Sequence, residues 1–247
     1  MKVSIVTVVF NGKHTIQRCI DSVLGQNHPD IEYIIVDGQS TDGTIELIKS
    51  YGTRITHFLS EKDHGIYDAM NKGIDLATGE VIGIINSDDF YANSEVISKV
   101  VKALNETSYD ACYADLDYID NLDSGKIIRH WRSGEYSTSS FKNGWMPPHP
   151  TFFVKRKCYL DFGKFRLDFG SAADYELMLR MIEKNGVKIT YVPEVIVKMQ
   201  TGGVSNVSFK NRIEANKNDR KAWKVNQLKP RFYTLYLKPL RKLLQFL

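Results

Sequence analysis

The chain has 247 residues, of which 43% are hydrophobic, 25% are charged and 11% are aromatic. This balance is typical of a globular protein with a real core, and it excludes disordered and fibrous folds. The length predicts one large domain, or one domain with an appendage, rather than two equal domains.

Membrane-spanning, secreted and metal–thiolate proteins are disfavoured by the pattern of the chain. The longest apolar run near the start, Val3–Phe10, is much shorter than the roughly 18 residues of a spanning helix. No secretory signal is visible, so we expect a cytoplasmic protein. Cys19, Cys112 and Cys158 are widely spaced without a CxxC pair, and we expect them to be reduced and buried.

Charge is distributed unevenly along the sequence. The net charge is +4, but residues 209–247 carry eleven Lys or Arg against two acidic residues, which leaves the preceding part with a net charge of −5. An acidic body is therefore followed by a basic tail.

Strand and helix patterns alternate over the first hundred residues. Apolar runs predict strands, and apolar residues at helical spacing predict helices. The predicted elements, in chain order, are a strand Val3–Val9, a helix Ile16–Leu24, a strand Tyr33–Val36, a helix Thr44–Tyr51, a strand Ile55–Leu59, a helix Ile66–Ala77, a strand Val81–Ile85 and a helix Val96–Leu104. This order predicts an α/β fold with a mostly parallel sheet covered by helices on both faces.

The alternation is weaker after about residue 110. Short strands or hairpin arms are predicted at Ala111–Ala114, Tyr118–Ile119 and Lys126–Trp131, with a turn at Asn121–Gly125, a non-helical loop at Gly144–Pro150, an amphipathic helix at Ala172–Lys184 and an edge strand at Lys188–Val192. The loop prediction rests on its three prolines, which a helix interior does not accommodate.

Polar residues follow each of the four strands predicted in the first half. They are Asn11, the run Asp37–Gly43, the run Glu61–Asp63 and the run Asn86–Asp89. Ligands bind beyond the carboxyl ends of the strands in an open parallel sheet. We therefore expect the four groups to meet on one rim of the sheet.

Asp88 and Asp89 are adjacent carboxylates at the end of a buried strand. A cation would relieve their repulsion, and hard oxygen ligands favour Mg²⁺ or Mn²⁺ over Zn²⁺. Because so few ligands leave coordination positions to substrate phosphates, the pair points to a diphosphate substrate. The alternative is that Ser87–Asp89 only makes a turn and caps the next helix.

The run Val36–Gly43 (VDGQSTDG) also allows two interpretations. Its Gly, Ser and Asp residues suit a tight turn and a helix cap, whereas the carboxylate of Asp37 is able to accept the imide N–H of a pyrimidine base. The sequence contains neither GxxxxGK[ST] nor GxGxxG, so ATP and NAD binding lose their main support.

Four segments in a fixed order carry a family resemblance. They are Val3–Asn11 (VSIVTVVFN), Val36–Gly43 (VDGQSTDG), Ser60–Gly73 (SEKDHGIYDAMNKG) and Asn86–Asp89 (NSDD). Together they resemble the family 2 glycosyltransferases of bacterial polysaccharide synthesis, over roughly residues 3–200. The resemblance implies a GT-A fold, a nucleotide-diphospho-sugar donor that is usually UDP-linked, a divalent ion (Mn²⁺ or Mg²⁺) and inversion at the anomeric carbon.

The resemblance also implies roles for single residues. Asp37 is expected to bind the base, Asp88 the ribose or diphosphate, and Asp89 the metal, in a DxD-type motif that here begins with Asn86 instead of Asp. The backbone from Thr7 to Phe10 is expected to border the uracil. The predicted donor-binding residues are Thr7, Val9, Asn11, Asp37, Glu61, Asp63, Asp88 and His149, and the predicted metal ligand is Asp89.

Asp174 is the predicted catalytic base. The segment Ala173–Glu176 (ADYE) is similar to the acidic catalytic motif of the family. A sugar hydroxyl is a poor nucleophile, so a carboxylate within about 3 Å must take its proton during attack. The alternative is a purely structural capping box, Ser171–Asp174.

Two further features bear on the type of reaction. His149 is predicted to reach the diphosphate or metal from a loop that closes over the donor, and the alternative is a solvent-exposed loop histidine. The sequence contains no QxxRW, a motif that typifies the processive synthases of the family. The resemblance therefore implies a single addition of sugar.

The segment Lys229–Leu247 carries five positive charges and no acid, with apolar residues near helical spacing and an interruption at Pro239. A basic amphipathic helix is typical of a peripheral contact with anionic lipid at the inner face of a membrane. The alternatives are packing on the catalytic domain and packing on a partner subunit in a homodimer. Nucleic acid is disfavoured, because a rim of carboxylates repels phosphates.

We therefore predict a GT-A catalytic domain over residues 1–205, with a donor half (1–110) and an acceptor half (111–205), followed by a basic amphipathic extension (206–247). The predicted activity is inverting transfer of a sugar from a nucleotide-diphospho-sugar to a hydroxyl of a glycan or polyprenyl-diphosphate-linked acceptor. The alternatives are a nucleotidyltransferase or sugar-nucleotide hydrolase that uses the same carboxylate pair, and a catalytically silent, membrane-associated nucleotide-sugar binder.

Overall fold

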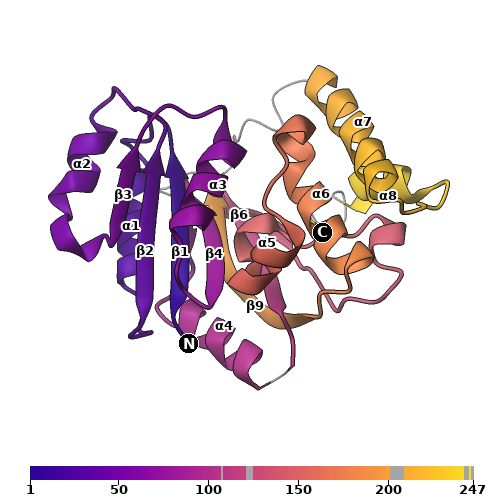
Figure 1. Ribbon diagram of the computed structural model, residues 1–247, viewed down its shortest axis with the longest axis horizontal. Helices are drawn as coiled ribbons and strands as arrows, with labels where there is room; N and C mark the ends of the chain where they lie inside the picture. The colour runs from indigo at the N-terminus through magenta and orange to yellow at the C-terminus, as the bar shows by residue number, and fades with distance from the viewer. Residues whose placement is uncertain (107, 121–124, 201–208, 242–244, 246–247) are drawn as a thin grey trace.

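A computed structural model describes the chain except for residues 107, 121–124, 201–208, 242–244 and 246–247. The strands are β1 (Val3–Val9), β2 (Ile31–Asp37), β3 (His57–Ser60), β4 (Val81–Asn86), β5 (Asp89–Tyr91), β6 (Ala111–Ile119), β7 (Ile127–Trp131), β8 (Phe153–Lys155) and β9 (Ile189–Gln200). In the described residues they form one sheet in the order β3-β2-β1-β4-β8-β6-β9-β5, and β7 pairs with β6. Helices cover both faces of this sheet (Figure 1).

The first half of the chain has the predicted parallel arrangement. Strands β1 to β4 are parallel, and the helices between and after them are α1 (Ile16–Leu24), α2 (Thr44–Ser50), α3 (Ile66–Leu76) and α4 (Val96–Asn105). Strand β1 is buried along its whole length, as expected for a continuous apolar run between two layers of helices. Each element predicted for this half is confirmed within about two residues at each end.

The second half of the sheet is mixed. Strand β8 is antiparallel to both β4 and β6, and β5 is antiparallel to β9. The two short strands predicted between residues 111 and 119 form one strand, β6, and its antiparallel pairing with β7 confirms the hairpin. The predicted turn at 121–125 lies mostly outside the described residues.

The edge strand predicted at Lys188–Val192 is the first part of a longer strand. Strand β9 runs to Gln200: Ile189–Val192 pair with β6 alone, as expected for an edge, whereas Val197–Met199 lie between β6 and β5. Its register against β6 shifts where Ala114 pairs with Val192 and Asp115 pairs with Val195. The extra residues there include Pro193 and the exposed Glu194, which interrupt the apolar pattern, so the sequence predicted only the first part of the strand.

The segment that leads to the acidic helix was predicted only in part. Residues 144–148 are irregular, as expected, but a single 3₁₀ turn then covers His149–Thr151. A further helix, α5 (Arg156–Phe162), was not predicted. The helix predicted at Ala172–Lys184 is present as α6 (Ala173–Met178), continued by a π-helical turn over Leu179–Lys184.

The C-terminal segment forms α7 (Phe209–Val225) and α8 (Thr234–Arg241), which flank α6 in Figure 1. Trp223 of α7 is 1% exposed and belongs to the same apolar core as the residues of α6, and Leu235 of α8 joins that core as well. Helices α7 and α8, which belong to the segment predicted as an extension, therefore contribute side chains to the core that contains α6. The helix predicted over Lys229–Leu247 is α8, and most of the segment after Arg241 lies outside the described residues.

One buried acid ties together the amino-terminal ends of the strands. Glu32, only 2% exposed, accepts hydrogen bonds from Lys2 Nζ (2.8 Å), Ser4 Oγ (2.5 Å), Thr78 Oγ1 (2.6 Å) and Thr78 N (2.7 Å). Burial raises the pKa of this carboxyl, but these donors outweigh burial and lower the pKa to about 2. The ionised form of Glu32 therefore stabilises the fold.

We predict that Glu32→Gln lowers the free energy of unfolding at pH 7 by about 3 kcal/mol, because a shift of one pKa unit corresponds to about 1.4 kcal/mol. The folded-state pKa of Glu32 lies below the unfolded value, so its contribution is present above about pH 4.5 and is lost as the pH falls toward 2. Urea unfolding at pH 7, 5 and 3 should show the variant and the parent converging in acid. Glu106→Gln, at an exposed position, is the control.

Candidate active site

The loops after β1 and β2 are joined by hydrogen bonds. The backbone N–H of Asn11 donates to Ser40 Oγ (2.7 Å), the side-chain oxygen of Asn11 accepts from Thr41 N (2.9 Å), and Gly12 N donates to Thr44 Oγ1 (3.0 Å). Asn11 has a φ of 52°, a left-handed conformation that asparagine adopts more readily than most residues. Asn11 thus holds the loop after β1 against the loop after β2.

Asp37 ends β2 with one oxygen used and one unpaired. Its Oδ2 accepts from Ser60 Oγ (2.7 Å) at the end of β3 and from Ser40 N (3.1 Å), whereas its buried Oδ1 has no hydrogen-bond partner. An unpaired buried carboxylate oxygen is costly, and a donor on a ligand would satisfy it. The second acid of VDGQSTDG, Asp42, has the structural role of the alternative interpretation. It accepts a hydrogen bond from Thr44 N and so caps the start of α2.

Glu61 and Asp63 lie at the same rim with partners of their own. Glu61 is half exposed and pairs with Lys72 Nζ at 2.9 Å, and its backbone N–H donates to the Asp37 carbonyl oxygen (3.0 Å). Asp63 accepts from Gly65 N (2.9 Å) ahead of α3. The other oxygen of Asp63 would be 2.5 Å from a Cβ on Gly38, so Asp63 lies directly against the residue that follows Asp37.

Thr7 and Val9 do not face the rim. Thr7 is fully buried, its hydroxyl lies 3.1 Å from Tyr33 Oη, and its backbone pairs with β2 and β4. Val9 is 4% exposed, and its carbonyl oxygen accepts from Gly38 N (2.9 Å). Both side chains are thus buried in a central strand at the edge of the rim, and their contact with the base stays a prediction.

The Asn86–Asp89 motif connects β4 to β5 through a two-residue turn at Ser87 and Asp88. The turn of the structural alternative is therefore present, but the helix cap is not, because α4 begins only at Val96 after a cap residue Glu95. The motif lies beside the first loop, since Ser87 Oγ would be 3.2 Å from a Cβ on Gly12. The four polar groups predicted to share one rim do so.

The two carboxylates of this motif have different surroundings. Asp89 is 1% exposed and accepts from Asn86 Nδ2 (3.0 Å), and burial together with the charge of Asp88 raises its pKa well above the ordinary value. Asp88 is only partly buried, and burial raises its pKa as well. Asp89, the first residue of β5, is therefore the buried carboxylate of the pair, and Asp88, in the turn, is the more accessible one.

His149 lies between the donor rim and the acidic helix. Its Nε2 is 3.5 Å from Asn86 Nδ2. Burial lowers the pKa of His149, while the negative charges of Asp174 and Asp88 both act in the opposite direction. The charge of one carboxylate from each half of the chain thus acts on the His149 imidazole. His149 is partly buried in the site and is not the solvent-exposed histidine of the alternative.

Asp174 is in the first turn of α6 and is partly buried. The capping-box alternative is not realised, because Ala172 is the cap residue, has no side-chain hydrogen bond, and Asp174 accepts instead from Tyr175 N (2.7 Å). Burial raises the pKa of Tyr67 in α3, and the charge of Asp174 raises it further. Asp174 therefore lies beside both α3 and His149.

Two tyrosines and an arginine extend the site beyond the predicted residues. Tyr67 comes from α3, and Tyr118 comes from β6, where burial and then the charges of Asp89 and Asp174 raise its pKa. The guanidinium of Arg129 lies 4.3 Å from the Tyr118 ring centroid. Asp89, Met199, Tyr118 and Arg129 are successive partners across β5, β9, β6 and β7, a row that only the sheet order reveals.

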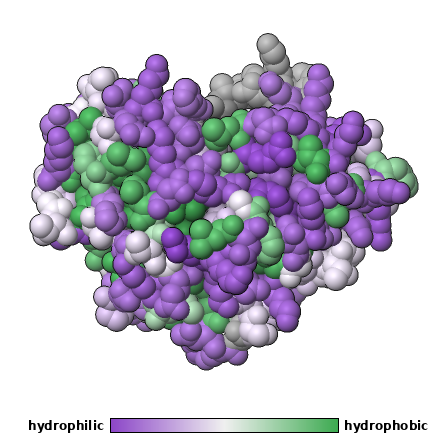
Figure 2. Space-filling view, in the orientation of Figure 1, coloured by the Kyte–Doolittle hydropathy of each residue, from purple (hydrophilic) through white to green (hydrophobic). Residues whose placement is uncertain are grey.

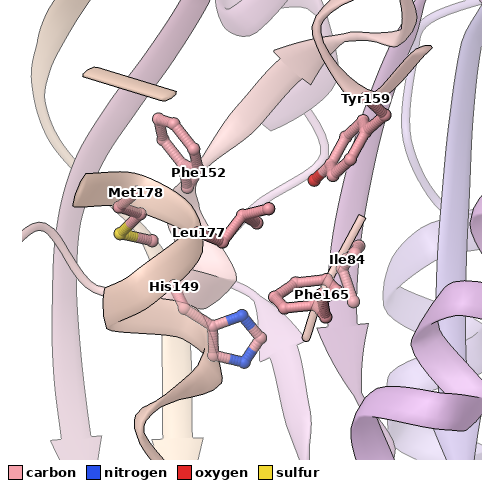
Figure 3. A pocket seen from close by; sticks show the side chains of 7 residues that line it. All are labelled: Ile84, His149, Phe152, Tyr159, Phe165, Leu177 and Met178. Carbon is pink, nitrogen blue, oxygen red and sulfur yellow. The ribbon is translucent and has the colours of Figure 1, made fainter. Parts of the chain in front are cut away.

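Two hollows near the site are separate from the donor rim. A gap of about 10 Å³, the size of one water molecule, is lined by Ile84, His149, Phe152, Tyr159, Phe165, Leu177 and Met178. His149 and Phe165 lie at one end of it, and Phe152 and Tyr159 lie at the other (Figure 3). A larger hollow of about 260 Å³ lies between α3 and α5, with Asp75, Arg156 and Leu160 in its lining. Neither includes the carboxylates of the rim.

The rim fits a divalent cation that is shared with a ligand. The buried oxygens Asn86 Oδ1 and Asp89 Oδ1 have no hydrogen-bond partner, and they lie next to Asp88 in the chain. Hard oxygen donors of this kind suit Mg²⁺ or Mn²⁺. Among the described residues, no group of three or more His, Cys, Asp or Glu side chains is arranged to hold a metal ion. The protein thus supplies part of a coordination shell.

The model of the family described as Glycosyl transferase family 2 matches residues 4–163 of this chain. The chain belongs to this family. A PGL/p-HBAD biosynthesis glycosyltransferase of Mycobacterium tuberculosis is 27% identical over 207 residues, which are 82% of this chain and 78% of the relative.

Solved glycosyltransferase structures confirm the predicted GT-A fold of this family member. Residues 1–349 of Staphylococcus aureus TarS, in complex with UDP-GlcNAc, superpose with a TM-score of 0.74 at 17% identity, over 96% of this chain and 69% of that one. A longer TarS chain is matched over only 38% of its length. The mannosyltransferase PcManGT from Pyrobaculum calidifontis, in complex with GDP-Man and Mn²⁺, gives a TM-score of 0.68 at 18% identity, over 96% of this chain and 68% of that one.

We predict that removing the charge of either Asp174 or Asp88 lowers the pKa of His149 further. Both carboxylates stabilise the imidazolium, so Asp174→Asn and Asp88→Asn should each shift the midpoint of its ring titration to lower pH. NMR titration of the histidine ring measures this midpoint. Asp161→Asn, on the exposed end of α5, should leave it unchanged. If Asp174→Asn left the titration midpoint of His149 unchanged, Asp174 would not lie close to the donor rim.

Proposed function

We propose that this family 2 glycosyltransferase catalyses a single inverting transfer of a sugar from a UDP-sugar to a hydroxyl group of a glycan or lipid-linked acceptor. The observation that carries the proposal is that His149, from the second half of the chain, reaches the donor rim, where its Nε2 lies 3.5 Å from Asn86 Nδ2. The charges of Asp88 on the rim and of Asp174 in α6 both act on this imidazole, which supports a site shared by the two halves. Direct displacement needs this arrangement, with the leaving group on one side and the base on the other.

Asp37 is the proposed partner of the base. Its unpaired Oδ1 is an acceptor without a donor, which complements the imide N–H of uracil, and Ser60 and Ser40 hold the carboxylate in place through Oδ2. Asp63 and Glu61 lie beside Asp37 on the same rim. Similarity to TarS, whose structure is a UDP-GlcNAc complex, supports UDP as the nucleotide.

Asp88 is the proposed metal ligand, with the unpaired oxygens of Asn86 and Asp89 behind it. When bound, Mn²⁺ or Mg²⁺ neutralises the negative charge that develops on the departing diphosphate. The Mn²⁺ in the PcManGT complex supports a metal of this class. His149, next to Asn86, is proposed to contact the diphosphate as a neutral imidazole, because burial lowers its pKa.

Asp174 is the proposed general base. It would accept the proton of the acceptor hydroxyl as the hydroxyl oxygen attacks the anomeric carbon from the face opposite the diphosphate. Because attack and departure occur on opposite faces, one displacement inverts the anomeric configuration. The positions of Tyr67 and Tyr118 beside Asp174 provide ring surfaces and hydroxyl groups on which an acceptor sugar can be oriented.

The remaining alternatives differ in their products. A nucleotidyltransferase would release pyrophosphate, whereas glycosyl transfer releases UDP. A catalytically silent nucleotide-sugar binder would bind UDP without releasing it from any UDP-sugar. The presence of a positioned third carboxylate favours transfer over both, because neither alternative needs Asp174 close to the donor rim.

We predict that Asp174→Asn lowers kcat by a factor of about 10² to 10⁴, the usual contribution of a positioned general base, while the KM for the donor changes by no more than about threefold. The asparagine keeps the size of the side chain but does not accept the proton. UDP release from a panel of UDP-sugars and acceptors measures the effect. Asp161→Asn is the matched control, and turnover of Asp174→Asn near that of the parent would remove the residue from this role.

We predict that Asp88→Asn abolishes most of the Mn²⁺-dependent gain in UDP affinity, whereas Asp89→Asn retains part of it. Loss of an outer-sphere partner typically costs about 10-fold to 100-fold in metal affinity, and loss of a direct ligand costs at least as much. Calorimetric titration of UDP with and without Mn²⁺ compares the two variants without knowledge of the donor sugar. A larger loss of the Mn²⁺-dependent UDP affinity in Asp89→Asn than in Asp88→Asn would identify Asp89 as the direct metal ligand.

A further inference from the structure

Helix α8 presents an apolar stripe to solvent. Phe232, Tyr236 and Leu240 are 90%, 64% and 53% exposed. Tyr236 and Leu240 are four residues apart and lie on one face of α8, and Phe232 lies in the turn that precedes the helix. Large apolar side chains are unusual at such exposure when they are contiguous. Figure 2 shows an apolar group projecting at the edge of the molecule, beside the segment that joins α7 to α8, within a mainly hydrophilic surface.

The opposite face of α8 packs against the rest of the protein, and these contacts keep the apolar stripe on the solvent side. Leu235 is buried in the core, Thr234 Oγ1 donates to the Lys142 carbonyl oxygen (2.6 Å), and Lys238 Nζ donates to Asp219 (2.7 Å). A Cβ on Gly144 would be 2.5 Å from Lys238 N, which shows how closely the backbones approach.

Basic side chains are exposed on the same two helices as the stripe and on their connection. Arg220 of α7 lies 6.0 Å from the Tyr236 ring centroid. The exposed cations on α7, α8 and their connection are Lys217, Arg220, Lys224, Lys229, Arg231 and Arg241. Of the two acids in this part of the chain, Asp219 is buried against Lys238 and only Glu214 is exposed. The exposed side chains of this part of the chain are therefore mainly apolar or positive.

We propose that this surface, defined by Phe232, Tyr236, Leu240 and the six cations, docks the enzyme on an anionic lipid bilayer. Apolar side chains enter the headgroup boundary while the cations contact the acidic headgroups. A second copy of the chain fits less well, because a symmetric contact through the same surface would place the cations of one copy against those of the other. In the described part of the chain no helix is both long and apolar enough to cross a membrane.

The docking surface is directly linked to the acidic helix. Lys238 Nζ lies 3.6 Å from the ring centroid of Tyr175, the residue after Asp174, and Arg231 donates to Asn143 Oδ1 (3.3 Å) in the segment that leads to His149. A bilayer bound to α8 thus lies on the acceptor side of the molecule. If the proposed function holds, the acceptor class favoured by this placement is a sugar carried on a lipid. The binding itself does not depend on catalysis.

Vesicle flotation with the full chain tests the surface directly. The protein should float with vesicles of phosphatidylcholine and phosphatidylglycerol in a ratio of about 3:1, and much less with phosphatidylcholine alone, since each cation near an anionic surface contributes about fivefold. Binding should fall when the salt concentration is raised to about 0.5 M. Equal flotation with both vesicle types, or none with either, overturns the proposal.

Matched substitutions distinguish binding through this surface from nonspecific hydrophobic binding. Phe232→Ser with Leu240→Ser should reduce vesicle binding at least about tenfold, because two large apolar side chains leave the lipid boundary. Leu160→Ser with Leu167→Ser removes side chains that are 67% and 50% exposed elsewhere and should leave binding unchanged. Circular dichroism checks that both variants are folded.

The charge and the competing occupant are tested separately. Lys229→Gln with Arg241→Gln should lower binding to anionic vesicles by roughly 25-fold at low salt. Sedimentation of the parent and of Phe232→Ser with Leu240→Ser measures the oligomeric state. A dimer that dissociates in this variant, together with an absence of vesicle binding, would assign the stripe to a second copy and refute the lipid. Loss of UDP release with intact flotation would instead count against the proposed function alone.

Discussion

The position of Asp174 depends on the anchoring of α6, and that anchoring comes from the C-terminal part of the chain. Trp223 Nε1 donates to Tyr175 Oη (2.9 Å), and Asn226 Nδ2 donates to Glu176 Oε1 (3.1 Å). Glu176 is fully buried and also pairs with Arg180 at 3.0 Å. A buried carboxylate is tolerated only when its partners are all in place, so the two residues after Asp174 permit one orientation of this turn. Helix α7 is therefore part of the catalytic framework.

The donor rim depends on topology in the same way. Because β3, β2, β1 and β4 are adjacent and parallel, strand ends that are 23 or more residues apart along the chain lie at the same edge. Asn11 and Ser60 then cross-link the ends of neighbouring strands. The apolar core positions the strands, and the polar cross-links position the side chains.

The sequence predicted the donor half well because its patterns are local there. Strands β1, β2 and β4 are continuous apolar runs, and the helices after them carry clear apolar faces. The acceptor half was predicted less well. Strands β5 and β8 have three residues each, too few for a periodic signal, and α7 is mostly polar, with its burial concentrated at Ala222 and Trp223.

The site was predicted where a residue's role follows from its place on a strand, and missed where it depends on a pairing. Asp88 and Asp89 are chemically identical neighbours, and only the pairing of β5 with β9, which begins at Asp89 and Met199, buries one of them. The same pairing brings Tyr118 into the row with Asp89. The burial of Thr7 and Val9 also follows from the sheet, because β1 is covered by a neighbouring strand on each side.

The electrostatics of the rim explain why a cation belongs with the nucleotide. Burial raises the pKa of both Asp88 and Asp89, which shows that the protein stabilises their ionised forms poorly. A diphosphate would add negative charge beside Asp88, and His149 does not compensate it at neutral pH because burial lowers its pKa. Repulsion in a partly buried site is strong. A divalent ion that binds together with the diphosphate offsets both the buried charge of the two carboxylates and their repulsion of the diphosphate. Metal and donor should therefore bind with positive cooperativity.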